Sequence, residues 1–96
     1  MHVISSLAIR LAANNYPNSA NALAAWLKLL KENNFKNFTE LKQIFGSVDK
    51  LGKFWVFDVA GNKLRIITAI HFNRGKVYVR AILNHKQYDQ EDWKTL

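Results

Sequence analysis

The sequence predicts an α+β domain in which N-terminal helices cover one face of a small antiparallel sheet. Apolar side chains in the first half recur at helical spacing, most clearly in Leu23, Trp26, Leu27 and Leu30. After residue 53 the pattern changes to aromatic and β-branched segments that are separated by glycine-containing turns. A chain of 96 residues is long enough for one two-layer core, so we expect a single domain over residues 1–96.

Three helical segments are expected before the pattern changes. The first lies around residues 7–11 and ends before Pro17, because the residue that precedes a proline avoids the helical region. The second carries the apolar stripe described above. The third lies around residues 41–45, with Thr39 as its N-terminal cap. Residues 3–4 are expected to add a short opening strand.

Three longer strands are expected in the second half of the chain. They cover residues 54–59, 63–72 and 77–84, with turns at 60–62 and 73–76. Short turns of this kind join neighbouring antiparallel strands. The sequence therefore predicts a meander.

The turn between the last two strands predicts their register. If residues 74–75 form the whole loop, Phe72 pairs with Val77 and Arg65 pairs with Asn84. Alternation then assigns four residues of the last strand to the helix-covered face: Val77, Val79, Ala81 and Leu83. The opposite face is expected to present five polar side chains together: Lys63, Arg65, His71, Tyr78 and Arg80.

Basic residues are concentrated in the same strands. Residues 59–88 contain six of the fourteen Lys and Arg residues and no acid, whereas the rest of the chain is nearly balanced. The six are Lys63, Arg65, Arg74, Lys76, Arg80 and Lys86. Almost all of the net charge of +7 therefore comes from one region. A positive field on a rigid sheet is typical of a protein that binds a polyanion, most often nucleic acid.

Several classes of protein are excluded by composition. The chain contains no cysteine, which rules out a disulfide framework, a thiol nucleophile and a thiolate metal site. No metal site is expected, because His2, His71 and His85 are far apart and no acid lies between Asp58 and Asp89. No apolar run is long enough to span a membrane, and the N-terminal pattern is not that of a signal peptide. We expect a cytoplasmic protein with no cofactor and no membrane partner.

The most reactive group of side chains is expected where the last strand ends. Arg65 is predicted to lie beside the segment that carries His85, Lys86 and Tyr88. Arginine holds phosphate oxygens with two parallel hydrogen bonds, histidine exchanges protons near neutral pH, and tyrosine stacks on a base or donates a hydrogen bond. In RNA the 2′-hydroxyl is a built-in nucleophile, so cleavage requires no nucleophile from the protein. Asp89, with Glu91 and Asp92, is expected to begin a last helical turn.

Each of these residues also has a purely structural interpretation. His71 can be a histidine at the rim of the core, His85 a capping residue, and Tyr88 and Trp93 can pack over the core. The residues alone therefore support RNA or DNA binding, with or without cleavage. An alternative to an enzyme is a non-catalytic binding module that uses the same basic face. A third interpretation is a face that docks an acidic protein.

The chain resembles the HigB toxins, the RelE-like partners in HigBA toxin–antitoxin modules. The resemblance lies in residues 61–66 (GNKLRI), 77–80 (VYVR) and 85–89 (HKQYD). Further similarities are at residues 1–5 (MHVIS), 35–42 (FKNFTELK), 45–49 (FGSVD) and 56–59 (VFDV). The similarity covers essentially the whole chain in order.

This resemblance implies a RelE-like fold and a toxin that cuts mRNA on the translating ribosome. In that superfamily the 2′-hydroxyl attacks without a metal and leaves a cyclic phosphate and a 5′-hydroxyl. The implied partner is a HigA-type antitoxin with a helix-turn-helix domain, and DNA is contacted only through that antitoxin.

The resemblance also implies roles for individual residues. Arg65 is similar to the arginine that such toxins place at the scissile phosphate, and His85 and Tyr88 occupy the place of their C-terminal catalytic side chains. His85 is the expected general base, with Lys63 or Tyr88 as alternatives. The residues expected to bind RNA are Lys63, His71, Lys76, Arg80 and Lys86.

Overall fold

Within residues 1–61 and 63–95, which the computed structural model describes, five strands form one sheet in the order β1-β5-β4-β3-β2. They are β1 (His2–Ile4), β2 (Asp49–Leu51), β3 (Phe54–Val59), β4 (Leu64–His71) and β5 (Lys76–Asn84). Strands β2 to β5 form an antiparallel meander, and β1 pairs in parallel with β5. The α+β class and the meander are confirmed. The short edge strand β2 was not predicted.

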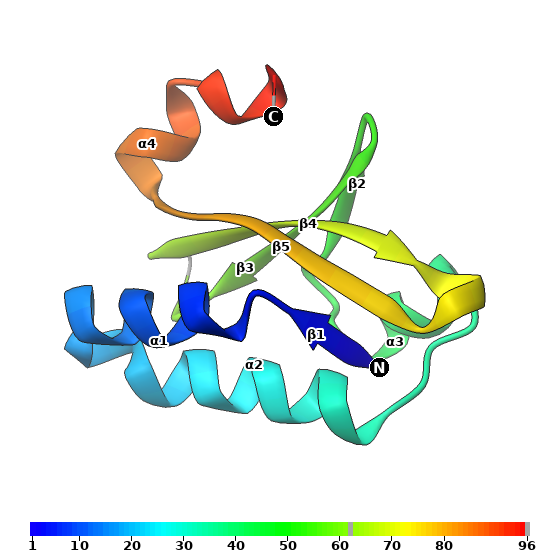
Figure 1. Ribbon diagram of the computed structural model, residues 1–96. Helices are drawn as coiled ribbons and strands as arrows, with labels where there is room; N and C mark the ends of the chain where they lie inside the picture. The colour runs from blue at the N-terminus through cyan, green and yellow to red at the C-terminus, as the bar shows by residue number, and fades with distance from the viewer. Residues whose placement is uncertain (62, 96) are drawn as a thin grey trace.

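Helices lie on both sides of this sheet (Figure 1). They are α1 (Ser6–Asn15), α2 (Ala20–Glu32), α3 (Phe38–Ile44) and α4 (His85–Asp89), with 3₁₀ turns η1 (Pro17–Ser19), η2 (Phe72–Arg74) and η3 (Asp92–Thr95). Helices α1 and α2 cover one face, whereas α4 and η3 lie over the other. No helix in residues 1–61 and 63–95 is long and apolar enough to cross a membrane.

The main core lies between the sheet and the N-terminal helices. The stripe predicted for α2 is confirmed, because Leu23, Trp26 and Leu30 are buried. The other buried members of the main core are Val3, Ile9, Ala12, Phe35, Leu41, Val48, Phe57, Leu64, Ile66, Ile70, Val77 and Val79. Helix α3 is capped by Asn37, whose side-chain oxygen accepts from the backbone N–H of Glu40 at 2.9 Å. Thr39 lies inside this helix, so its predicted role as the cap was wrong.

The predicted register between β4 and β5 was wrong. The loop contains four residues, Phe72–Gly75, rather than two, and His71 pairs with Lys76. Residues 72–74 form a 3₁₀ turn, and Gly75 closes the loop in the left-handed conformation at φ 62°. A glycine in this conformation is favoured because it has no Cβ. Phe72 therefore lies in the loop, and Arg65 pairs with Leu83 instead of Asn84.

A β-bulge also changes the side of the sheet to which the end of β5 points. Thr68 pairs with Val79 and Ile67 pairs with Ala81, so Arg80 is the extra residue. An extra residue reverses the alternation of side chains beyond it. Ile82 consequently packs against the main core. Ala81 and Leu83, which were predicted on the helix-covered face, lie on the opposite face.

That opposite face, which was expected to present the basic side chains together, is partly covered. Phe54, Val56, Ile67 and Trp93 form a second apolar cluster. Trp93 belongs to the C-terminal segment, residues 85–95, which contains α4 and η3. Packing of this segment gives the sheet a small second layer on the face opposite α1 and α2 (Figure 1).

The turn from β3 to β4 begins with two residues of positive φ. Ala60 has φ 54° and Gly61 has φ 60°, and the carbonyl of Ala60 accepts from the N–H of Lys63 at 3.3 Å. The third residue of the predicted turn, Asn62, lies outside the described residues. This turn brings the ends of β3 and β4 together beside α4.

Candidate active site

Arg65 lies on β4 at the junction between the sheet and α4. Its cross-strand neighbour on β3 is Asp58, and the Arg65 Nε and Asp58 Oδ1 atoms are 2.7 Å apart. The Arg65 side chain is only 12% exposed and that of Asp58 is 27% exposed. The guanidinium carbon also lies 5.2 Å from the centre of the Tyr88 ring. The structure therefore holds this cation between a carboxylate and an aromatic ring.

Tyr88 projects from α4 and is held in place by Trp93. The two rings are stacked, with centroids 5.1 Å apart and planes inclined by 9°. The Trp93 Nε1–H also donates to the Tyr88 carbonyl at 3.0 Å. Burial raises the pKa of the Tyr88 hydroxyl, whereas the positive charge of Arg65 acts in the opposite direction. Tyr88 is therefore a neutral hydrogen-bond donor at neutral pH.

His85 is the first residue of α4 and pairs with Asp89 one turn later. The His85 Nδ1 and Asp89 Oδ2 atoms are 2.9 Å apart, and both side chains are about 60% exposed. A carboxylate that accepts from Nδ1–H leaves Nε2 of a neutral histidine as the proton acceptor. Structural interactions of this kind orient the catalytic histidines of other enzymes. His85 is thus oriented by Asp89 and exposed to solvent.

Helix α4, which was not predicted, begins at His85 because Asn84 caps it. The Asn84 side-chain oxygen accepts from the Gln87 N–H at 2.8 Å, and the Gln87 side chain accepts from the Asn84 N–H at 3.0 Å. This reciprocal pair is a capping box. The cap starts the helix at His85 and presents His85 and Tyr88 from neighbouring faces of one turn. The helical turn expected at Asp89, Glu91 and Asp92 corresponds to η3, which begins at Asp92.

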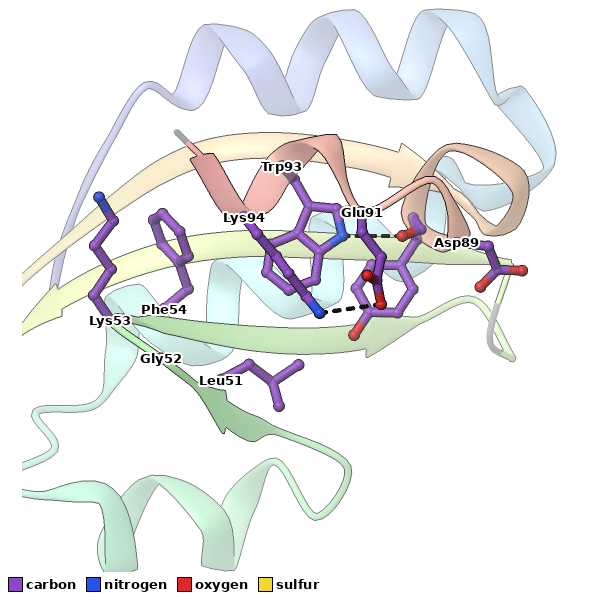
Figure 2. Close-up of a pocket in the computed structure, with 9 residues that line it drawn as sticks. Leu51, Gly52, Lys53, Phe54, Asp89, Glu91, Trp93 and Lys94 are labelled. Carbon is purple, nitrogen blue, oxygen red and sulfur yellow. Dashed lines mark hydrogen bonds and ion pairs between the residues drawn. The ribbon is translucent and has the colours of Figure 1, made fainter.

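A cleft of about 860 Å³ opens beside Tyr88. It lies between the β2–β3 turn and the C-terminal segment (Figure 2). Leu51, Phe54 and Trp93 provide apolar walls. Lys53 and Lys94 add positive charge, although Lys94 is also paired with Glu91 at 3.0 Å. The cleft is large enough for a small organic group such as a nucleobase.

Two of the predicted RNA-binding residues line a separate hollow. His71 and Arg80, together with Lys53, surround a smaller depression of about 370 Å³. Arg80 lies three residues along β5 from Leu83, the partner of Arg65, which corresponds to about 10 Å. His71 is six residues from Arg65 along β4, or about 20 Å.

The remaining predicted residues lie around this arrangement. Lys63 and Lys86 are exposed near the ends of β4 and α4. Lys76 is half-buried at the hairpin end of β5, opposite His71. The predicted single basic face is therefore divided into two parts, with the second apolar cluster between them. The first is the Arg65 site, around Arg65 and α4, and the second is the hairpin group, which consists of His71, Lys76 and Arg80.

Sequence reasoning missed Asp58 as a member of the Arg65 site. The signal was present, because alternation along β3 places Asp58 on the same face as Phe54 and Val56. Alternation gives the face of Asp58 but not its neighbour on β4, which depends on the β3–β4 register that pairs Asp58 with Arg65. Among residues 1–61 and 63–95 no group of three His, Cys, Asp or Glu side chains is arranged to hold a metal.

The fold and the site together define a small basic α+β domain in which Arg65 contacts Tyr88, while His85 lies on the same short helix as Tyr88. Residues 19–91 match the HigB toxin family, described as the RelE-like toxic component of a toxin–antitoxin system. The chain belongs to this family. The resemblance stated from the sequence is confirmed, and membership implies an antitoxin partner.

Individual relatives agree with this assignment. The chain is 37% identical to the mRNA interferase toxin HigB of Escherichia coli strain K12 over 92 residues, covering 93% of this chain and 88% of that protein. The mRNA interferase HigB of Shigella flexneri matches to the same extent. That of Escherichia coli O6:H1 is 37% identical over 93 residues, covering 94% and 90%. These names agree with the activity expected from the sequence.

Proposed function

We propose that this HigB-family toxin is an mRNA interferase that cleaves messages on the translating ribosome and so inhibits translation. The observation that carries the proposal is the Arg65 site. It combines a partly buried arginine, a neutral tyrosine and a carboxylate-oriented histidine at one end of the sheet. Such a set provides a phosphate ligand and two proton-transfer groups, which are the groups that RNA cleavage by its own 2′-hydroxyl requires.

The proposed reaction is an internal transfer within RNA. The 2′-oxygen forms a bond to phosphorus, and the bond from phosphorus to the 5′-oxygen breaks. The products are a 2′,3′-cyclic phosphate and a 5′-hydroxyl. One proton leaves the 2′-hydroxyl and one proton is delivered to the 5′-oxygen, so the stoichiometry requires no metal or redox group.

Arg65 stabilises the negative charge that grows on the phosphate oxygens in the transition state. His85 is the proposed general base because Asp89 holds its Nδ1 and leaves Nε2 to accept the 2′-proton. The raised pKa of Tyr88 disfavours the role of base and supports that of donor to the phosphate or the leaving oxygen. Lys63 stays the alternative base.

The basic residues outside this site are proposed to hold the flanking RNA. Lys63 and Lys86 lie closest to the Arg65 site in the chain and contact neighbouring phosphates of the message. His71, Lys76 and Arg80 lie toward the hairpin and contact a more distant phosphate or ribosomal RNA. Only a substrate that extends over both groups, as mRNA in the ribosome does, uses the whole charge pattern.

We also propose a HigA-type antitoxin with a helix-turn-helix domain as the partner, and the cytoplasm as the compartment where the toxin meets ribosomes. Covering the Arg65 site with acidic side chains is a direct means of inhibition. Contact with DNA occurs through the antitoxin only.

The test is inducible expression in a bacterium, with the 5′ ends of mRNA mapped before and after induction. The wild-type protein and the matched control Arg10→Ala, an exposed position on α1, should both produce new 5′-hydroxyl ends in translated regions. Arg65→Ala and His85→Ala should produce few or none. If the folded wild-type protein gives no new ends, the chain binds nucleic acid without cutting it. If both site variants cut like the wild type, the assigned site is wrong.

A further inference from the structure

Asp58 has no role in the proposed reaction, yet its carboxylate is paired with Arg65. The carboxylate lies on the neighbouring strand and pairs with the Nε atom at 2.7 Å. It is also the last acid before the acid-free stretch that ends at Asp89. An acid in the centre of a basic site works against phosphate binding by charge alone, so its presence calls for a physical reason.

The geometry of the pair supplies that reason. Nε is the inner nitrogen of the guanidinium, so a bond there restricts rotation of the whole planar group about the side chain. The Tyr88 ring bounds the same cation at 5.2 Å. Neighbours on two different elements, β3 and α4, therefore restrict the orientation of the guanidinium. A planar group binds phosphate well only when its plane is correctly oriented.

Stability alone does not account for the pair. A partly buried ion pair gains little net free energy, because desolvation of both ions offsets their attraction. Apolar residues of similar size at positions 58 and 65 would extend the second apolar cluster, because its members Val56 and Ile67 adjoin the pair along β3 and β4. Orientation of Arg65 is the function that an apolar pair cannot provide.

We propose that Asp58 is a positioning residue for the cleavage reaction, one that orients the Arg65 guanidinium toward the scissile phosphate without contacting the RNA itself. The proposal rests on the proposed function of Arg65. Asp58 acts in the transition state, where the position of Arg65 matters most, and contributes little to ground-state binding. A misplacement of about 1 Å in such a group is enough to slow a reaction by about a hundredfold.

The test compares Asp58→Ala, Asp58→Asn and the control Glu32→Gln, an exposed acid of α2 that pairs with Lys28. Cleavage of mRNA is measured on programmed ribosomes with purified proteins that have the wild-type circular dichroism spectrum. Asp58→Ala should lower kcat by tenfold to a hundredfold and change KM by less than about threefold. Asp58→Asn retains a hydrogen-bond acceptor and should recover most of the activity. The control should match the wild type.

Two further readouts separate positioning from other roles. The Nε–Hε resonance of Arg65 should be protected from exchange in the wild type and in Asp58→Asn, and lost in Asp58→Ala. The pH profile of kcat should keep its shape in Asp58→Asn. Loss of the acidic limb of that profile would identify Asp58 as a general base and overturn the proposal.

The remaining outcomes are also decisive. Wild-type kcat in Asp58→Ala would refute the positioning role and leave the proposed function intact. If Asp58→Ala does not fold, the kcat of Asp58→Asn and the exchange protection of the Arg65 Nε–Hε proton test the positioning role instead. An Arg65 Nε–Hε proton that exchanges freely in the wild type refutes the proposal. An inactive wild-type protein would refute the proposed function, and the Asp58 role with it.

Discussion

Replacing Trp93 by alanine tests whether the C-terminal segment is an integral part of the folded domain. Trp93 is 4% exposed, packs against Phe54 with ring centroids 6.2 Å apart, and stacks on Tyr88. A buried indole removes about 200 Å² from water, worth roughly 5 kcal/mol at 25 cal/mol per Å² as an upper bound. The lost hydrogen bond to the Tyr88 carbonyl adds about 1 kcal/mol. Measured Trp→Ala changes in protein cores suggest a net loss of about 3–5 kcal/mol.

The assay is urea unfolding followed by circular dichroism, combined with limited proteolysis and the ribosome cleavage assay. The free energy of unfolding should fall by about 3–5 kcal/mol, or by less if the C-terminal segment detaches before the rest of the domain unfolds. In the second case a protease should cut the variant after Asn84 under conditions in which the wild type is resistant. Either event removes Tyr88 from its place over Arg65, so cleavage of mRNA should be lost.

Trp93→Phe is the matched control. It keeps an aromatic ring against Phe54 and Tyr88 but removes the Nε1 donor, so the expected loss is about 1–2 kcal/mol. The free energy of unfolding of Trp93→Ala could instead lie within about 1 kcal/mol of the wild-type value, with its C-terminal segment still resistant to protease. The second apolar cluster would then not be what holds this segment on the sheet. In that case Trp93 would not hold Tyr88 beside Arg65.

Two further predictions concern α4. The raised pKa of Tyr88 means that the fold disfavours the phenolate, so stability should be complete below the unfolded pKa near 10 and decline as pH rises through and above that value. Tyr88→Phe should show a weaker decline from pH 9 to 11 in urea unfolding, and equal slopes would contradict burial as the cause. Asn84→Ala should destabilise by about 1 kcal/mol through loss of the cap, whereas Asn84→Ser should retain most of the stability. An alanine variant as stable as the wild type would show that the capping box does not contribute.

The division of the basic residues has a consequence for binding. Arg65 and Tyr88 are restricted by several neighbours, whereas Lys63 and Lys86 are exposed and adaptable. If Arg65 binds the scissile phosphate as proposed, a fixed group at that phosphate and exposed charges around it are expected of an enzyme that places one phosphate accurately and holds the flanking strand loosely.

The sequence by itself determined the class of fold, the stripe of α2 and the family. Helical and strand periodicities are local properties, and they survive in the structure because each amphipathic segment has to bury its apolar side. The motifs around Arg65 and His85 were likewise readable, since they are contiguous in the chain.

Only the tertiary structure decided how the second face of the sheet is used. A four-residue loop in place of two residues, and one extra residue at Arg80, shifted the register and turned Ala81 and Leu83 to the other side. Such details depend on turn geometry and packing, which no local pattern encodes. The same long-range pairing put Asp58 beside Arg65, and packing of Trp93 against Phe54 made the C-terminal segment a cover for part of the sheet.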